Sequence, residues 1–571
     1  MVTATPTLTT INKTEARAQR GMVATKDIHA TRAGVQMLEM GGNAVDAAVA
    51  ACFAIGVVEP MSSGIGGGGY LVYQLGDRGG VVGFPMKGPL AAKPDMYELT
   101  GEAAVGNFGW AGVVNDENLD GPRSIAVPGA VAGLCEAHRL LGKLPLKEVI
   151  APAVSLARDG HSPGWHNMYA LGLMASRLFD FDELRNVFMP GGRLPAGDLT
   201  SPALLKQPDL GDVLDAIGRE GPSAFYAGEI ARALASDIQA KGGIVSEEDL
   251  AEYRPFVWDS GLEFGYRGHT VRVPPFACAG TTSAMTLRSL DGFDVASMGH
   301  NSADALHAYI YGARLAYADR FAYMADPAFV DAPWKGLVSD GYTELRRGQI
   351  DSERLGNIEV GDPWAFDEGA PGKKLAASAP ALDAGTTHLC AMDGDGNAVS
   401  LTNTLMAGFG SGFVPKGTGV VMNNGMMWFD PVPGRVNSIM PGKYPLNNMT
   451  PALVMGDDGV RLAVGASGGR RITNCVTQLI SKVVDYGIGP QEAIDSPRVD
   501  CSLPVTSVDP RLSADVVAEL EGKGHRIYVI GDNHVQGGFA SFASPVAIVR
   551  DGDGGFRAGV DTFHSAYAEG L

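Results

Sequence analysis

GTTHLCAMDGDGNAVSLTNTL, residues 385–405, holds two short β-type runs separated by a turn rich in Asp and Gly. Each run carries the Thr, Val and Leu residues that are common in strands, and residues 393–397 are typical of a hairpin loop. The stretch therefore predicts an antiparallel β-hairpin.

More β-type runs follow the hairpin, whereas helical spacing dominates the chain before it. Strands are predicted at 419–424, 451–456 and 461–467, and helices at 31–58 (interrupted by Gly41 and Gly42), 302–324 and 472–487. The helix at 302–324 is predicted to be amphipathic, with Ser302 as its N-cap. Because hairpins outnumber βαβ units in the C-terminal third, we expect an α/β (α+β) fold of antiparallel sheets covered by helices.

The segment 356–385, just before the hairpin, is rich in Gly, Ala, Pro and Asp and has no sustained period, so we expect a mobile surface segment. A cut after Gly385 would make Thr386 a chain N-terminus, whose own α-amine could accept the hydroxyl proton. Such a cut needs an accessible segment and a small preceding residue, and both are present. The plainer interpretation is that Thr386 simply begins a strand.

Composition and charge exclude some classes of binding partner. The chain has 571 residues, 45% of them hydrophobic, and a formal net charge of −19. A negative field repels phosphates, so we expect neither nucleic acid nor a membrane surface as a partner. The longest uncharged apolar run, 47–58, is too short to span a bilayer, which takes about 20 residues. The first twenty residues contain no apolar h-region, so we expect no secretory signal and a cytoplasmic location. The alternative is a periplasmic or secreted protein whose signal was removed.

Six cysteines are scattered along the chain without a C-x-x-C pair. A disulfide framework or a cysteine-based zinc site is therefore not expected, and we predict no metal and no cofactor.

Two glycine-rich motifs match known functional sequence patterns. Residues 64–69 fit G-x-G-x-x-G, but they follow a helix and precede a strand, which is the reverse of a dinucleotide site, so a close backbone approach is the better interpretation. Residues 465–469 fit G-x-S-x-G between a strand and a helix, which is the setting of a hydrolase nucleophile elbow at Ser467. Its triad partners would come from Asp500, Asp509 or Asp532 and from His525, His534 or His564. The alternative is that Gly468 and Gly469 present backbone N–H groups as an oxyanion hole.

The chain as a whole resembles the γ-glutamyltransferase family. The hairpin resembles the start of that family's small subunit, and residues 21–73 resemble its N-terminal signature. Further motifs follow in family order: PGAVAGL, LARDG, GPSAFYAGEIA, GGIVSEEDLAEYRP, YADRFAY and GASGGRRI. The resemblance implies a four-layer αββα sandwich, the N-terminal-nucleophile hydrolase fold. It also implies autocleavage before Thr386 into a large subunit, 1–385, and a small subunit, 386–571. The two stay together as a heterodimer, which could itself dimerise. It makes Thr386 the nucleophile, Thr404 its hydrogen-bond partner, and Gly468 and Gly469 the oxyanion hole.

The chain departs from the family where the γ-glutamyl group is held. The arginine that binds the α-carboxylate is replaced by Pro85, and two serines by Asn447 and Asn448. The acidic residues that bind the α-amine are replaced by Met427 and Trp428, and an asparagine after the second threonine by Met406. Met406, Met427 and Trp428 would form an apolar acyl pocket, and Lys87 is a candidate anion clamp whose alternative is a solvated surface lysine.

These substitutions predict retained chemistry and altered specificity. We expect an amide hydrolase or acyltransferase acting through an acyl-Thr386 intermediate on a small-molecule amide whose acyl group is not γ-glutamyl. By family analogy, the candidates include a dicarboxylic monoamide, a β-lactam side chain such as the glutaryl group, or a small amide. The alternatives are glutathione hydrolysis or γ-glutamyl transfer with a rebuilt clamp, a serine esterase using Ser467, and a non-catalytic binding protein on the same fold.

Overall fold

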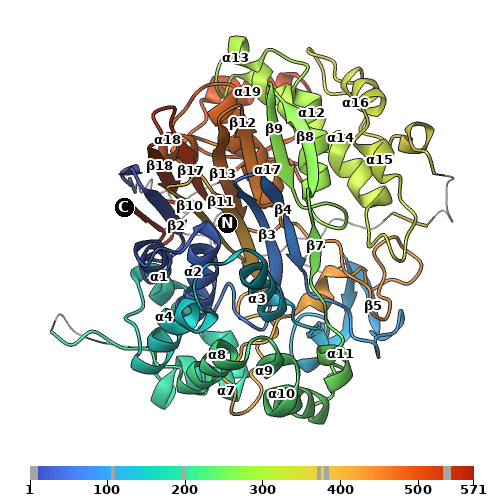
Figure 1. Cartoon of the computed structure of the whole chain (residues 1–571). Coiled ribbons are helices and arrows are strands. Elements are labelled where there is room, and N and C mark those ends of the chain that lie inside the picture. The colour runs from blue at the N-terminus through green and yellow to red at the C-terminus, as the bar shows by residue number, and fades with distance from the viewer. Residues whose placement is uncertain are drawn as a thin grey trace.

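Two seven-stranded sheets face each other in the centre of the protein (Figure 1). The computed structural model describes residues 11–103, 110–195, 197, 200–369, 375–377, 385–530 and 542–571. The Thr386 sheet has the order β19 (Tyr567–Gly570), β2 (Gly21–Thr25), β10 (Thr387–Asp393), β11 (Ala398–Thr404), β3 (Gly68–Leu75), β4 (Arg78–Phe84) and β7 (Phe256–Trp258). The second sheet has the order β1 (Ala16–Ala18), β18 (Phe556–Val560), β17 (Ser544–Arg550), β13 (Gly459–Ser467), β12 (Ala452–Gly456), β9 (His269–Val273) and β8 (Leu262–Tyr266). Every pairing within these two sheets is antiparallel.

The alternation of side chains along β10 shows how the layers form. Leu389 and Ala391 pack in a core shared with helices, whereas Cys390 and Met392 point the other way into a core between the two sheets. Alternate residues of a strand face opposite sides of a sheet, so a strand buried on both faces is apolar throughout. The second sheet has its own core against helices on its outer face. The result is the expected four-layer αββα sandwich.

Helices form the two outer layers. The layer on the Thr386 sheet and its extensions contains α1 (Ile28–Glu39), α2 (Ala44–Val58), α3 (Ala130–Leu141), α4 (Leu146–Asp159), α5 (Trp165–Leu173), α6 (Ala175–Asp180), α7 (Asp182–Phe188), α8 (Pro208–Glu220), α9 (Ser223–Tyr226), α10 (Gly228–Ala240) and α11 (Glu247–Ala251). The layer on the second sheet contains α12 (Gly280–Leu290), α13 (Val295–Met298), α14 (Ala303–Tyr323), α15 (Trp334–Leu337), α16 (Asp340–Arg347), α17 (Arg471–Val484), α18 (Pro490–Asp495) and α19 (Ala514–Gly522).

Helix α2 is apolar on all sides because it is covered on all sides. Every residue of Ala44–Val58 is buried, between the Thr386 sheet and helices α1 and α4. The helix begins with a capping box, in which Asn43 accepts from the Asp46 N–H and Asp46 accepts from the Asn43 N–H. It ends at Glu59, a charged residue that the fold thereby carries into the interior.

The hairpin and most helices form where the sequence predicts them, with two differences. Residues 419–424 do not form a strand; Met422 makes only an isolated bridge to Gly66. Helix α14 has the expected Ser302 cap but is not amphipathic, since it is buried along nearly its whole circumference by α12, α16, α17 and α19. Most of 370–384, within the predicted mobile segment, lies outside the described residues.

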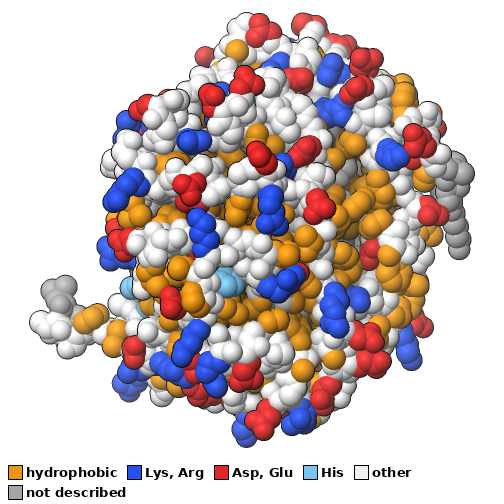
Figure 2. All heavy atoms as spheres, in the orientation of Figure 1, with side chains coloured by type: hydrophobic (Ala, Val, Ile, Leu, Met, Phe, Trp, Pro, Cys, Tyr) orange, Lys and Arg blue, Asp and Glu red, His pale blue; other side chains and the backbone are white. Residues whose placement is uncertain are grey.

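The surface carries charged side chains of both signs. Figure 2 shows Lys and Arg side chains interspersed with Asp and Glu across one face of the molecule. Among the described residues, no helix has the length and apolar character needed to cross a membrane.

The glycines at 64–69 allow three backbone segments to approach one another. A Cβ added at Gly66 would lie 2.2 Å from the Val421 carbonyl oxygen, and one added at Gly67 would lie 2.0 Å from that of Thr404. A Cβ at Gly69 would lie 2.1 Å from the Thr402 carbonyl oxygen. The motif therefore serves close packing against β11 and its continuation.

Replacing Gly67 with alanine is expected to displace Thr404 and to lower the free energy of unfolding by about 1–3 kcal/mol, a typical effect of overpacking. Urea unfolding of the purified variant measures this loss. Gly265→Ala is the matched control, because a Cβ there meets nothing within 4 Å. Equal stability of the two variants would contradict the close-approach interpretation.

Candidate active site

The hairpin brings two threonine hydroxyls together at one end of the sheet. Thr387 pairs with Asn403 in the β10–β11 register, so Thr386, one residue earlier, lies opposite Thr404. Thr386 Oγ1 is 3.1 Å from Thr404 Oγ1 and 2.8 Å from the Gly385 carbonyl oxygen. Thr404 Oγ1 donates to the same carbonyl oxygen at 2.6 Å. Two hydroxyls therefore meet at the carbonyl of the Gly385–Thr386 peptide bond.

The backbone after Thr404 fixes the orientation of its hydroxyl. The Met406 N–H donates to Thr404 Oγ1 at 2.8 Å, which leaves the Thr404 proton for the Gly385 carbonyl. Met406 adopts φ = 85°, a left-handed conformation that costs a non-glycine residue about 1–3 kcal/mol. Strain of this kind is typical of functional sites, and here it aims the N–H at Thr404.

A buried ion pair supports the strand at Thr386, and the sequence analysis did not identify it. Lys26, just after β2, donates from Nζ to the Thr386 carbonyl oxygen at 3.1 Å and pairs with Glu59 Oε1 at 2.8 Å. Both side chains are almost completely buried. Removing one partner of such a pair leaves an uncompensated buried charge, so the pair holds β2, α2 and Thr386 in one arrangement. The sequence does contain one indication of a buried charge: Glu59 directly follows an apolar run of twelve residues.

The two glycines predicted as an oxyanion hole lie between β13 and α17. Gly468 has φ = 132° and Gly469 φ = 66°, conformations that favour glycine. Within the described part of the chain, neither backbone N–H donates a hydrogen bond. A Cβ at Gly465, three residues before Gly468, would lie 2.2 Å from the His388 ring, two residues after Thr386. The end of β13 therefore lies over the start of β10, and both N–H groups are available there.

His388, two residues after Thr386, packs between the two sheets. Its ring lies between the sheets, with Nδ1 2.9 Å from Thr402 Oγ1, and burial lowers its pKa to about 3. His388 is therefore a neutral packing residue.

The described residues contain no Ser–His–Asp triad around Ser467, which the serine-esterase alternative requires. Ser467 Oγ is 3.5 Å from the Ser544 carbonyl oxygen, and β13 lies in an antiparallel sheet, unlike the strand before a nucleophile elbow. His525 pairs with His307, and His564 with Asp561. Asp500 binds Asn474 and Ser502, and Asp509 binds Arg511. Asp532 and His534 lie outside the described residues.

The two asparagines predicted to bind substrate make hydrogen bonds to other groups of the protein. Asn447 donates from Nδ2 to Tyr70 Oη and to the Ala277 carbonyl oxygen. Asn448 Oδ1 accepts from the buried guanidinium of Arg320 at 3.0 Å. Both side chains thus stabilise the loop before β12.

The three residues predicted to line an apolar acyl pocket are part of one hydrophobic core, and the pocket itself stays a prediction. Met406, Met427 and Trp428 belong to the core between the sheets and are buried. Lys87 is half-buried, and its ammonium lies 5.9 Å from the centre of the Tyr444 ring. No described carboxylate pairs with it.

Comparison with known proteins agrees with this geometry. The family model described as Gamma-glutamyltranspeptidase matches residues 30–570. The chain is 35% identical over 537 residues to Acylase ACY 1 proenzyme of Pseudomonas sp. (strain V22), covering 94% of this chain and 91% of that protein. It is 32% identical over 520 residues to Glutathione hydrolase proenzyme of Bacillus subtilis (strain 168), covering 89% and 85%. The crystal structure of cephalosporin acylase from Bacillus halodurans superposes with a TM-score of 0.85 at 26% identity, covering 100% of this chain and 99% of that one.

The αββα sandwich with a threonine at the head of a central hairpin defines an enzyme of the N-terminal-nucleophile hydrolase class. Within that class, the chain belongs to the γ-glutamyltranspeptidase family.

Proposed function

We propose that the protein is an N-terminal-threonine amide hydrolase or acyltransferase that forms an acyl ester on Thr386. The observation that supports this most directly is the meeting of the Thr386 and Thr404 hydroxyls at the Gly385 carbonyl oxygen. The hydroxyl that would cut the chain is the one that would later attack substrate.

The first step is cleavage of the chain itself. Thr386 Oγ1 attacks the Gly385 carbonyl carbon, and the O–H of Thr404 polarises that carbonyl. The carbon–nitrogen bond breaks as the nitrogen takes up the hydroxyl proton, which leaves an ester and a free α-amine on Thr386. Water then hydrolyses the ester and releases the two polypeptides, 1–385 and 386–571.

Turnover repeats the chemistry on a substrate amide. The new α-amine accepts the Thr386 hydroxyl proton as Oγ1 attacks the substrate carbonyl, and it returns the proton to the leaving amine. The N–H groups of Gly468 and Gly469, which donate no hydrogen bond to any described residue, are the proposed donors to the oxyanion. Water, or a second amine in a transfer reaction, then releases the acyl group.

The acyl group we propose lacks the γ-glutamyl α-amine. Met427 and Trp428 occupy the positions of the acidic residues, Pro85 that of the arginine, and the amides of Asn447 and Asn448 already bind the protein. One relative is named an acylase and one solved relative a cephalosporin acylase, which supports a non-γ-glutamyl acyl group.

The purified protein is expected to run as two polypeptides of about 40 and 19 kDa, in proportion to chain length. N-terminal sequencing of the smaller one is expected to begin Thr-Thr-His. An active enzyme that remains one intact chain would disprove the proposed cleavage. The two polypeptides are expected to co-elute in gel filtration, because strands of each lie in both sheets.

A further inference from the structure

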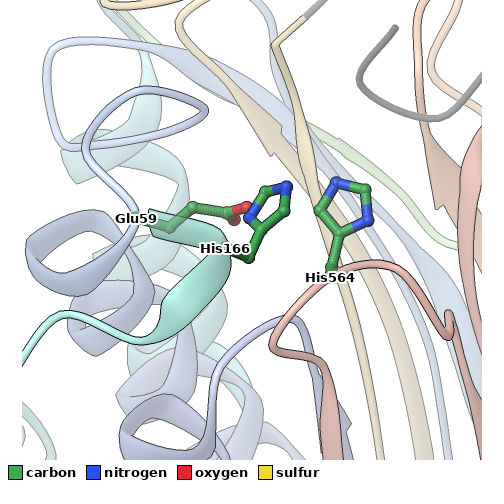
Figure 3. Close-up of side chains that lie close together, drawn as sticks. All are labelled: Glu59, His166 and His564. Carbon is green, nitrogen blue, oxygen red and sulfur yellow. The ribbon is translucent and has the colours of Figure 1, made fainter. Parts of the chain in front are cut away.

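Three side chains with metal-binding atoms lie close together: Glu59, His166 and His564 (Figure 3). Glu59 is the C-cap of α2, His166 lies in the first turn of α5, and His564 lies between β18 and β19. One ligand atom from each residue lies within 4.8 Å of the others, and all three residues are buried. We call these three residues the Glu59 cluster.

One carboxylate oxygen of Glu59 is open. Oε1 is paired with Lys26, but Oε2 has no hydrogen-bond partner among the described residues although it is buried. A buried acceptor without a partner destabilises the folded protein. Glu59 also lies at the C-terminal end of α2, where the helix dipole disfavours a negative charge. A second cation beside Lys26 would relieve both costs.

The imidazole of His564 is held in the orientation that metal ligands adopt. Its Nδ1 donates to Asp561 Oδ1 at 2.7 Å, and the backbone N–H groups of Phe563 and His564 donate to the same oxygen. Since a carboxylate only accepts, Nδ1 carries the proton, and the lone pair of Nε2 remains available. A carboxylate that binds the far nitrogen of a ligating histidine is the usual outer support of a metal site.

The second imidazole completes the donor set. The rings of His166 and His564 are 4.2 Å apart between centres and tilted by 43°. Imidazole binds a metal ion through the lone pair of a ring nitrogen in its neutral form.

We propose that the Glu59 cluster binds a divalent transition-metal ion of the zinc type. Two imidazoles and one carboxylate suit Zn²⁺, whereas Ca²⁺ and Mg²⁺ prefer sites made of oxygen alone. Zinc–ligand bonds of about 2.0–2.2 Å place tetrahedral ligand atoms roughly 3.4 Å apart, so side-chain movements of about an ångström bring the three atoms onto one ion. Water fills the fourth position.

The proposed ion is structural and does not depend on the proposed catalysis. Glu59 and His166 precede the Gly385–Thr386 bond and His564 follows it, so the ion would join the two parts of the chain. Glu59 would bridge the ion through Oε2 to the Lys26 ammonium through Oε1, and Lys26 in turn holds the Thr386 carbonyl oxygen. The ion would thus stabilise the strand that carries the nucleophile.

Metal binding to untagged, chelator-treated protein tests this proposal. Isothermal titration with Zn²⁺ is expected to give one ion per chain and a higher thermal midpoint. Co²⁺ is expected to give the intense visible bands of a low-symmetry, four- or five-coordinate site. Glu59→Gln keeps the shape of the side chain and its hydrogen bond to Lys26 but removes the charge, and is expected to weaken Zn²⁺ binding at least tenfold. Asp561→Asn, which loosens His564, is expected to weaken it by about 10–100-fold.

His307→Gln is the matched control, because His307 belongs to another close histidine pair, with His525, outside the cluster. Its affinity is expected to equal that of the unmodified protein. Failure of the folded, unmodified protein to bind one Zn²⁺ at micromolar free metal would overturn the proposal, whether or not the variants fold. Equal binding by Glu59→Gln and the unmodified protein would also overturn it.

Discussion

Thr386→Ala is expected to abolish both chain cleavage and turnover, because one hydroxyl performs each reaction. The loss in kcat is expected to be roughly four orders of magnitude or more, as for other nucleophile deletions. Thr386→Ser, which keeps the hydroxyl, is expected to be cleaved and to retain measurable activity. Gel electrophoresis reports cleavage, and hydrolysis of an acyl p-nitroanilide reports turnover.

Ser467→Ala separates this mechanism from that of a serine esterase. Among the described residues, Ser467 Oγ makes one weak contact, with the Ser544 carbonyl oxygen, so its removal is expected to leave activity within about tenfold of the unmodified enzyme. A folded but inactive Ser467→Ala, together with an active Thr386→Ala, would establish the esterase instead.

Glutaryl-p-nitroanilide is expected to be a better substrate than γ-glutamyl-p-nitroanilide. The two compounds differ in the α-amine, and the positions that would hold it carry Met427 and Trp428 in the core between the sheets. Two missing charged contacts are expected to cost the γ-glutamyl substrate about 3–6 kcal/mol, or roughly two to four orders of magnitude in kcat/KM. Measuring kcat/KM for both on the processed enzyme tests this. A tenfold or larger preference for the γ-glutamyl compound would mean that other residues rebuild the clamp, and Asn447 and Asn448 would be the first to mutate.

A substitution at Lys87 provides a second test of the predicted acyl specificity. If its ammonium meets the free carboxylate of the glutaryl group, Lys87→Met raises KM for that substrate and leaves KM for an uncharged acyl anilide unchanged. Lys93→Met is the matched control, since Lys93 is an exposed lysine nearby in the chain. Equal effects of the two substitutions would show that Lys87 is a surface residue without a role in binding.

Local patterns predicted the central hairpin and its threonines, because the turn at 393–397 sets the register that places Thr386 opposite Thr404. The stretch 419–424 looked like a strand because of its apolar residues. In the structure the side chain of Asn423 binds the Gly66 and Ala126 carbonyls, so tertiary contacts rather than a ladder hold this stretch. Helix α14 was predicted to have a solvent face, but the hydroxyls of Tyr309 and Tyr317 find partners on α17 and just before it.

Long-range side-chain contacts were beyond sequence analysis. Lys26 and Thr386 are 360 residues apart, and a charged residue carries no local pattern that names its partner. The Glu59 cluster draws on three distant parts of the chain, so no spacing motif could reveal it. The expectation that no metal binds was based on the cysteines, and a site made of histidine and glutamate is outside that argument.

The strand order of the two sheets has a consequence for folding. Five ladders join strands from before Gly385 to strands from after it: β19–β2, β2–β10, β11–β3, β1–β18 and β12–β9. In one chain these pairings form as a unimolecular reaction, whereas after a cut at 385 they would have to form between two molecules at their bulk concentration. A cut enzyme would therefore be long-lived while folded but unable to recover efficiently once denatured. Its working lifetime would be set by its rate of unfolding rather than by an equilibrium.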